Sequence, residues 1–235
     1  MNILQWNEPI IFNEIGHAHV RENGVCEDSF KINKLKDGNW IAVTICDGAG
    51  SALYGEQGAK IVAQQFNIGL IEIASLINQK IPDTWISDEI LKLVIKIRSY
   101  IRDHAGDTGM KDYHTTLVSV LVNSQYGFSI HIGDGAIFGG NFEIKENGTC
   151  LNKNYFLSEP SNGEYSNETY FVTEARWIKN IHIKPIQNLD WIALGSDGGC
   201  EAILNNKGML RGDFITKLFN ALTQFKDENE ADILY

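Results

Sequence analysis

The segment Ile41-Ala-Val-Thr-Ile-Cys-Asp-Gly-Ala-Gly-Ser-Ala52 contains the pattern on which the fold prediction depends. A run of apolar and β-branched residues predicts a strand, and Asp47-Gly48 ends that strand. A strand that ends in this way brings a carboxylate to the edge of a sheet, and the glycine lets a ligand or another backbone segment come close. The segment therefore predicts a carboxylate at the edge of a β-sheet.

Two further acidic elements have the same relation to predicted strands. Asp197-Gly198 follows the strand-like run at residues 191–196, and Glu27-Asp28 precedes the run at residues 29–32. A single Asp-Gly pair is most often only a turn, but three acidic elements at strand ends favour a shared site. Carboxylate oxygens are hard ligands that select Mg²⁺ or Mn²⁺ over zinc. We therefore expect a site for these cations.

The composition limits the classes of protein. The net charge of −10 argues against non-specific binding to nucleic acid, which needs a basic surface. No stretch reaches the roughly 18 apolar residues of a membrane span, and the N-terminal residues lack the pattern of a secretory signal. The four cysteines form no Cys-x-x-Cys pair, so reduced thiols and a cytoplasmic protein are expected. The chain shows no compositional break, and we expect one domain over residues 1–235.

Apolar periodicity predicts the remaining elements. Turn residues at 36–39 and 123–127 indicate two β-hairpins, because Gly and Asn supply the backbone conformations that such turns need. Helical spacing of apolar residues predicts helices over 54–78 and 85–103, the second of which has Ser87 or Asp88 as its N-cap. Hairpins and consecutive helices in this order predict an α+β fold of antiparallel sheets flanked by helices.

The second half of the chain supports four more predictions. Residues 181–186 and 190–198 are interpreted as the two strands of a further hairpin, and residues 214–225 as a short closing helix. The polar segment 157–169 is predicted to be a long loop and a candidate lid. His131 alternates with isoleucines in a predicted strand, and we expect its side chain on the face opposite the core.

Six segments in this order resemble the protein phosphatase 2C (PPM) family, and the likeness is greatest to a compact bacterial branch. They are residues 16–30 (GHAHVRENGVCEDSF), 41–52 (IAVTICDGAGSA), 114–122 (HTTLVSVLV), 128–140 (FSIHIGDGAIFGG), 164–173 (EYSNETYFVT) and 191–203 (WIALGSDGGCEAI). The resemblance implies a four-layer α-β-β-α sandwich of two antiparallel sheets flanked by helices. It also implies metal-dependent hydrolysis of phosphoserine and phosphothreonine in proteins, by a water that bridges two Mn²⁺ or Mg²⁺ ions in the cleft between the sheets.

The resemblance also implies metal ligands. Asp47 matches the carboxylate that bridges both ions, the carbonyl oxygen of Gly48 completes the first site, and Asp197 binds the second ion. Asp28 and Glu27 match an acidic pair that supports the site, largely through bound water.

A last carboxylate of the family precedes the final strand. Asp232 is the best match for it, and Asp227 is the alternative. The chain stops three residues after Asp232, so we expect the final strand to be cut short.

The sequence departs from the family at two positions. Asn23 stands where many members carry an arginine that binds the substrate phosphate, and either Arg21 or His19 is expected to replace it. Arg21 is favoured because a guanidinium binds phosphate through two hydrogen bonds. Ala49 stands where eukaryotic members have a histidine that protonates the leaving group, so a metal-bound water or His19 must supply that proton.

Other matching positions are expected to support the sheets. Thr115-Thr116 and Gly133-Asp134-Gly135 match family positions that pack and hydrogen-bond behind the metals, and Ser196 is expected to satisfy backbone groups beside Asp197. For Asp134, direct metal binding is the less favoured alternative.

The expected partner is a phosphorylated protein, so the enzyme would oppose a serine/threonine kinase, and we expect a monomer. Two alternatives remain at this stage. One is a degenerate family member that binds a phosphoprotein or another partner without efficient catalysis, which the missing Arg and His favour. The other is an unrelated metallohydrolase that acts on small phosphoesters or nucleotides.

Overall fold

A computed structural model describes residues 26–36, 39–77, 81–145, 148–161 and 169–205, together with residues 9, 11, 211, 216 and 217. Within these residues the strands form two sheets in which every pairing is antiparallel. One sheet has the order β1 (Asp28–Lys34), β2 (Ile41–Asp47), β3 (Leu117–Val122), β4 (Tyr126–Ile132), β7 (His182–Gln187). The other has the order β6 (Gly148–Ser158), β5 (Ala136–Lys145), β8 (Trp191–Gly195).

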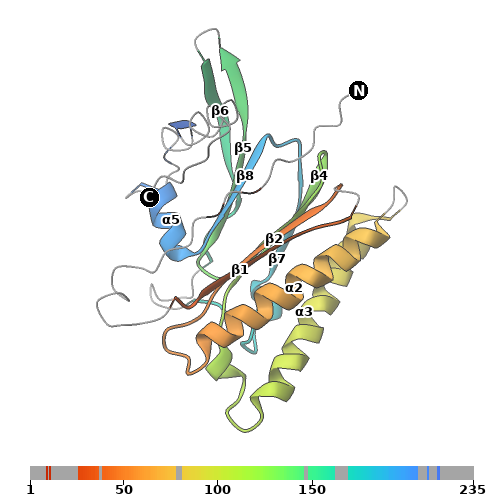
Figure 1. The fold of residues 1–235 in the computed structure, drawn as a ribbon, viewed down its shortest axis with the longest axis vertical. Coiled ribbons are helices and arrows are strands. Elements are labelled where there is room, and N and C mark those ends of the chain that lie inside the picture. Colours follow the sequence, from red (N-terminus) through yellow and green to blue (C-terminus); the bar gives the residue numbers. More distant parts are fainter. Residues whose placement is uncertain are drawn as a thin grey trace.

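Helices cover the outer faces of the two sheets (Figure 1). The long helices α2 (Gly55–Leu76) and α3 (Asp83–Ala105) lie side by side on the five-stranded sheet. The short helix α5 (Asp197–Ile203) packs on the three-stranded sheet through Cys200 and Ile203. A 3₁₀ turn, η1 (Met110–Tyr113), and one helical turn, α4 (Trp177–Asn180), complete the described elements. The arrangement is the α-β-β-α sandwich that the resemblance implied.

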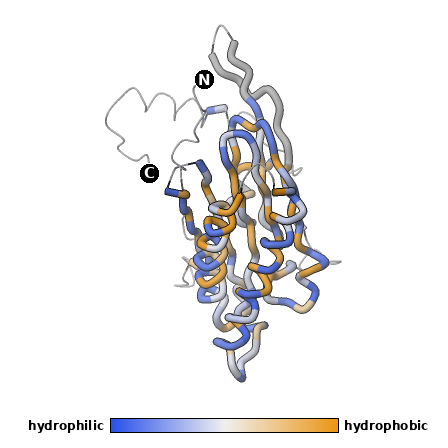
Figure 2. The backbone as a smooth tube through the Cα atoms, turned by 90° about the vertical axis from the view of Figure 1, so that its right-hand side faces the viewer, coloured by the Kyte–Doolittle hydropathy of each residue, from blue (hydrophilic) through white to orange (hydrophobic). Residues whose placement is uncertain are grey.

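The side chains of β3 alternate between two apolar layers, one on each face of the five-stranded sheet. Leu117 and Leu121 belong to the core beneath the helices, whereas Val118, Val120 and Val122 belong to the core between the sheets. Successive side chains of a strand point to opposite faces, so a strand that is apolar on both faces must be covered on both. Figure 2 shows apolar residues concentrated along the strands, while apolar and polar residues alternate along the two helices.

The predicted helices are confirmed with small changes of boundary. The N-cap prediction for the second helix is wrong, because α3 begins at Asp83, directly after Pro82, and Ser87 and Asp88 lie inside it. Ile86 is fully buried against the sheet side of the helix pair, so apolar burial extends the helix one turn before those polar residues.

The two early hairpins are confirmed. β1 pairs with β2, and β3 pairs with β4. The Asn123 carboxamide oxygen accepts hydrogen bonds from the backbone N–H groups of Gln125 and Tyr126, both at 2.9 Å. This side chain closes the turn in the way that makes asparagine common there.

The hairpin predicted from residues 181–186 and 190–198 is wrong. β7 pairs with β4 in the five-stranded sheet, whereas β8 pairs with β5 in the other sheet, so residues 188–190 carry the chain from one sheet to the other. Asn188 has a φ of 54° at this crossing, which asparagine tolerates better than most residues. The hairpin of β5 and β6 was not predicted.

The prediction for His131 is also wrong, because the three-stranded sheet covers the face on which it lies. Its side chain has no exposed surface, and its Nδ1 lies 2.7 Å from the Ser158 hydroxyl of β6. Burial lowers the pKa of His131 to about 4, so the imidazole is neutral and links the two sheets.

Two of the predicted elements, a loop and a helix, lie largely outside the described residues. Of the predicted loop 157–169, Leu157 and Ser158 belong to β6, and residues 162–168 are not described. Of the predicted helix 214–225, residues 216 and 217 are described, and they are helical. No helix within the described ranges has the length and apolar character needed to cross a membrane.

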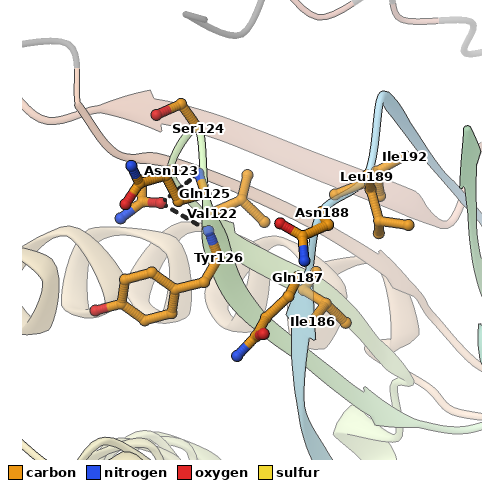
Figure 3. Close-up of a pocket in the computed structure, with 10 residues that line it drawn as sticks. All are labelled: Val122, Asn123, Ser124, Gln125, Tyr126, Ile186, Gln187, Asn188, Leu189 and Ile192. Carbon is orange, nitrogen blue, oxygen red and sulfur yellow. Dashed lines mark hydrogen bonds between the residues drawn. The ribbon is translucent and has the colours of Figure 1, made fainter. Parts of the chain in front are cut away.

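A small hollow lies between the β3–β4 turn and the connection from β7 to β8 (Figure 3). It is lined by uncharged residues such as Asn123, Gln125 and Asn188. It sits at the opposite end of β3 from Thr116 and the predicted carboxylates. The hollow therefore has no cation for a phosphate and no carboxylate for a metal.

Candidate active site

Asp28 and Asp47 face each other across two neighbouring strands. They are a directly opposed pair in the antiparallel register of β1 and β2, and they stand where β1 begins and β2 ends. Ile32 of β1 and Ile45 of β2 lie in the core between the sheets, and period-2 alternation places both aspartates on that same face. The five-stranded sheet therefore presents two carboxylates at one edge of the space between the sheets.

Asp197 approaches from the other sheet. It follows β8 by two residues and is the first residue of α5. The pKa of Asp47 is raised to about 9 by burial, by the negative charges of Asp28 and Asp197, by a hydrogen bond with Asp197, and by the charge of Asp134. A proton on Asp47 relieves this repulsion. The structure thus brings together three carboxylates that the sequence predicted and adds a fourth, Asp134.

The backbone of Asp47 is held by two threonines. The Thr116 N–H and the Thr115 hydroxyl both donate to the Asp47 carbonyl oxygen at 2.9 Å, and the Asp47 N–H donates to the Thr116 hydroxyl at 3.0 Å. Both threonines are buried. These contacts are the supporting role predicted for Thr115-Thr116, and they hold the backbone of Asp47 rather than its side chain.

Gly48 and Glu27 lie beside Asp47 at the same edge of the five-stranded sheet. The Gly48 N–H donates to the Glu27 carbonyl oxygen at 3.2 Å, and Gly48 forms an isolated bridge with Thr115. A Cβ on Gly48 would lie 2.9 Å from the backbone nitrogen of Glu56 and closer still to the carbonyl group of Gly55. Only glycine lets the turn after Asp47 pack this closely on the start of α2.

Asp134 lies in the crossing from β4 to β5. Gly133 before it has a φ of +119°, and a Cβ on Gly135 after it would lie 2.6 Å from the Gly195 carbonyl oxygen. The Thr169 hydroxyl donates to the Asp134 carboxylate at 2.6 Å. The glycines have the packing role that was predicted, but the charge of Asp134 also reaches Asp47. Its Gly-Asp-Gly context after a strand was a signal of the same kind as Asp47-Gly48.

Ser196 has a different role from the one predicted. It was expected to satisfy backbone groups, but its hydroxyl donates to the Asp28 carboxylate at 2.9 Å and makes no capping bond to α5. This contact joins a residue of the β8–α5 turn to a residue of β1, and so connects the two sheets at the carboxylates.

The donor set suits a hard divalent cation. Asp28, Asp47 and Asp197 supply only oxygen donors, and the repulsion that raises the pKa of Asp47 is the kind that a bound cation removes. Among the described residues, no three His, Cys, Asp or Glu side chains already surround one point as a coordination shell would. Because metal ligands must be deprotonated, metal binding at Asp47 would displace its proton.

The remaining predicted site residues lie outside the described part of the chain: His19, Arg21, Asn23, Asp227 and Asp232. Ala49 is described, and its N–H donates to the His114 carbonyl oxygen at 2.9 Å. The roles assigned to Arg21, His19 and Asp232 stay predictions.

Solved structures share this fold. A bacterial serine phosphatase matches with a TM-score of 0.58 at 16% identity, covering 84% of each chain. The serine/threonine phosphatase Stp1 of Staphylococcus aureus matches with a TM-score of 0.53 at 17% identity, covering 85% of this chain and 82% of that chain. The chain therefore has the same fold as these two structures.

Sequence comparison identifies the family. Residues 15–233 match the model of the family described as protein phosphatase 2C. Serine/threonine-protein phosphatase 3 of Escherichia coli K12 is 24% identical over an alignment 233 residues long, and the match covers 94% of this chain and 84% of that protein. The chain belongs to the protein phosphatase 2C family, as the six segments indicated.

Proposed function

We propose that this chain hydrolyses phosphoserine and phosphothreonine in proteins, and that Asp28, Asp47 and Asp197 hold the divalent cations for that reaction. One observation carries the proposal. Carboxylates from both sheets converge around Asp47 so closely that its pKa rises to about 9. Buried carboxyl groups with strongly perturbed pKa values are typical of functional sites.

Each described residue has a definite task in this proposal. Asp47 stands at the centre, because its charge interacts with Asp28, Asp197 and Asp134. The Gly48 carbonyl oxygen and the Glu27 side chain complete the ligand set beside it. Cations bound there, Mn²⁺ or Mg²⁺, would lower the pKa of a water and neutralise charge on the phosphoryl oxygens. Arg21, or else His19, would hold the phosphate.

The three thiols that the structure describes favour hydrolysis by water over attack by cysteine. Burial raises the pKa of Cys46 well above its ordinary value and raises that of Cys200 to about 12. The pKa of the less buried Cys26 is also raised, again chiefly by burial. Because the thiolate is the nucleophile, these groups are poor candidates for a phosphocysteine intermediate.

The partner that fits this activity is a phosphorylated protein, so the chain would oppose a serine/threonine kinase. We propose that it acts as a monomer, in the cytoplasm, over the single domain 1–235. The acidic net charge of −10 disfavours a nucleic-acid partner.

A substrate panel in excess Mn²⁺ tests the substrate class. We expect phosphate release from phosphothreonine and phosphoserine peptides at least about 10-fold faster than from nucleotides of equal concentration. A preference for nucleotides would contradict the protein-phosphatase proposal. If calorimetry detects bound Mn²⁺ but no substrate is hydrolysed, the chain is instead a degenerate family member that binds a partner without efficient catalysis.

A further inference from the structure

The proposed metal site is divided between the two sheets. Asp28 and Asp47 belong to the five-stranded sheet, whereas Asp197 follows β8 of the three-stranded sheet. Packed sheets lie about 10 Å apart, and that spacing depends on the side chains between them. A metal site that spans the gap needs a contact at the carboxylates that fixes the distance between its halves.

Ser196 makes such a contact. Its hydroxyl lies 2.9 Å from an Asp28 carboxylate oxygen, and its side chain is buried with 8% exposure. Ser196 directly precedes Asp197, so one hydrogen bond links the backbone of a proposed ligand on one sheet to the side chain of an acidic residue on the other.

The hydroxyl serves Asp28 rather than its own helix. Ser196 occupies the N-cap position of α5, where a serine oxygen commonly accepts a hydrogen bond from a backbone N–H of the first turn. No such capping bond forms here. The local stabilisation that serine usually supplies at this position is replaced by a bond across the sheets.

The backbone of Ser196 is held from the other side. A Cβ on Gly135 would lie 2.6 Å from the Gly195 carbonyl oxygen and 3.5 Å from the Ser196 Cα, so the β4–β5 crossing packs directly on the end of β8. The Ser196 carbonyl oxygen accepts from the Cys200 N–H at 2.9 Å, which anchors it to α5. The main chain that carries the hydroxyl is therefore held in place beside Asp28.

We infer that Ser196 is a positioning residue, which sets the separation of Asp28 from Asp197 for metal binding. The inference rests on the proposed function, because it presumes that these carboxylates bind a cation. Without the hydroxyl, the turn that carries Asp197 loses its bond to β1.

Calorimetric titration of the metal-free protein with Mn²⁺ tests the inference. We expect Ser196→Ala to bind Mn²⁺ about 10-fold more weakly than wild type, the usual size of effect when a partner of a metal ligand is removed. Ser196→Thr keeps the hydroxyl and should bind within about 3-fold of wild type, since only an added methyl group distinguishes it.

Ser119→Ala is the matched control. The Ser119 hydroxyl is fully buried, donates to the Val43 carbonyl oxygen at 2.8 Å and lies 2.8 Å from the Thr44 hydroxyl on the helix side of the same sheet. This variant loses a buried hydroxyl far from the space between the sheets, so it should lower the melting temperature and leave the Mn²⁺ affinity unchanged.

The outcomes separate this inference from the proposed function. If wild type binds Mn²⁺ and Ser196→Ala binds it equally well, the inference fails and the proposed function stands. If Ser196→Ala and Ser119→Ala weaken binding by the same factor, the effect is general destabilisation and the inference also fails. If wild type binds no Mn²⁺, the proposed function fails and the inference fails with it.

Discussion

Replacing Asp47 by asparagine is expected to lower kcat/KM for p-nitrophenyl phosphate in Mn²⁺ by about 10³-fold or more, the range seen when a central electrostatic group is removed. Asp47 interacts with the charges of Asp28, Asp197 and Asp134, so no other described carboxylate is as central. Asparagine keeps the shape and removes the charge. The measurement is the initial rate over a range of substrate concentrations. Activity within 10-fold of wild type, roughly 1.4 kcal/mol, would contradict the site assignment.

The same variant should be more stable than wild type when metal is absent. The pKa of Asp47 is raised to about 9 in the folded protein, against about 4 in an unfolded chain. The folded state is therefore favoured below pH 4 and loses stability as the pH rises toward 9. Asparagine cannot ionise, so its advantage in melting temperature should grow over that range in the presence of a chelator. A simple folding defect would instead lower both activity and stability.

Gly48→Ala is expected to reduce both stability and activity strongly. The new Cβ would lie 2.9 Å from the Glu56 nitrogen and closer to the Gly55 carbonyl group, and backbone atoms cannot turn away as a side chain can. Overpacking of this kind costs about 1–3 kcal/mol, which lowers the melting temperature by about 2–4 °C per kcal/mol. A displacement of about 1 Å beside Asp47 would also lower kcat about 100-fold.

Gly198→Ala is the matched control, because Gly198 follows Asp197 as Gly48 follows Asp47. A Cβ on Gly198 has no heavy atom within 4 Å, and this glycine lies in the first turn of α5. Alanine should therefore be neutral there or raise stability slightly. Calorimetric melting and the aryl phosphate assay measure both variants. Equal effects of the two substitutions would contradict the close packing described for Gly48.

Elements with strong local patterns could be predicted from the sequence. The helices α2 and α3 and the hairpins β1–β2 and β3–β4 follow from apolar periodicity and turn residues, which are local signals. The assignment of β7 and β8 to different sheets could not, because pairing with β4 and β5 is a contact between distant segments. His131 was misplaced for the same reason, since nothing near it in sequence reveals the sheet that covers it.

The features of the candidate site also fall into two groups, those with a local sequence signal and those that depend on contacts between distant segments. Asp28, Asp47 and Asp197 could be proposed because each carboxylate stands at a strand end, and the family resemblance supplied their order. The bond from Ser196 to Asp28 joins residues 168 positions apart, and the link from Thr169 to Asp134 spans 35 positions. Such contacts depend on how the two sheets pack, so they cannot be predicted from a local sequence pattern.

The central claim is that hydrolysis requires a divalent cation held by carboxylates of both sheets. Its most direct test is the initial rate on p-nitrophenyl phosphate for chelator-treated protein, titrated with Mn²⁺, beside Asp197→Asn. We predict no activity before metal is added, a saturable rise for wild type, and a rate at least about 100-fold lower for Asp197→Asn at the same Mn²⁺ level. Hydrolysis by the chelated wild-type protein, or an equal response from Asp197→Asn, would contradict the claim.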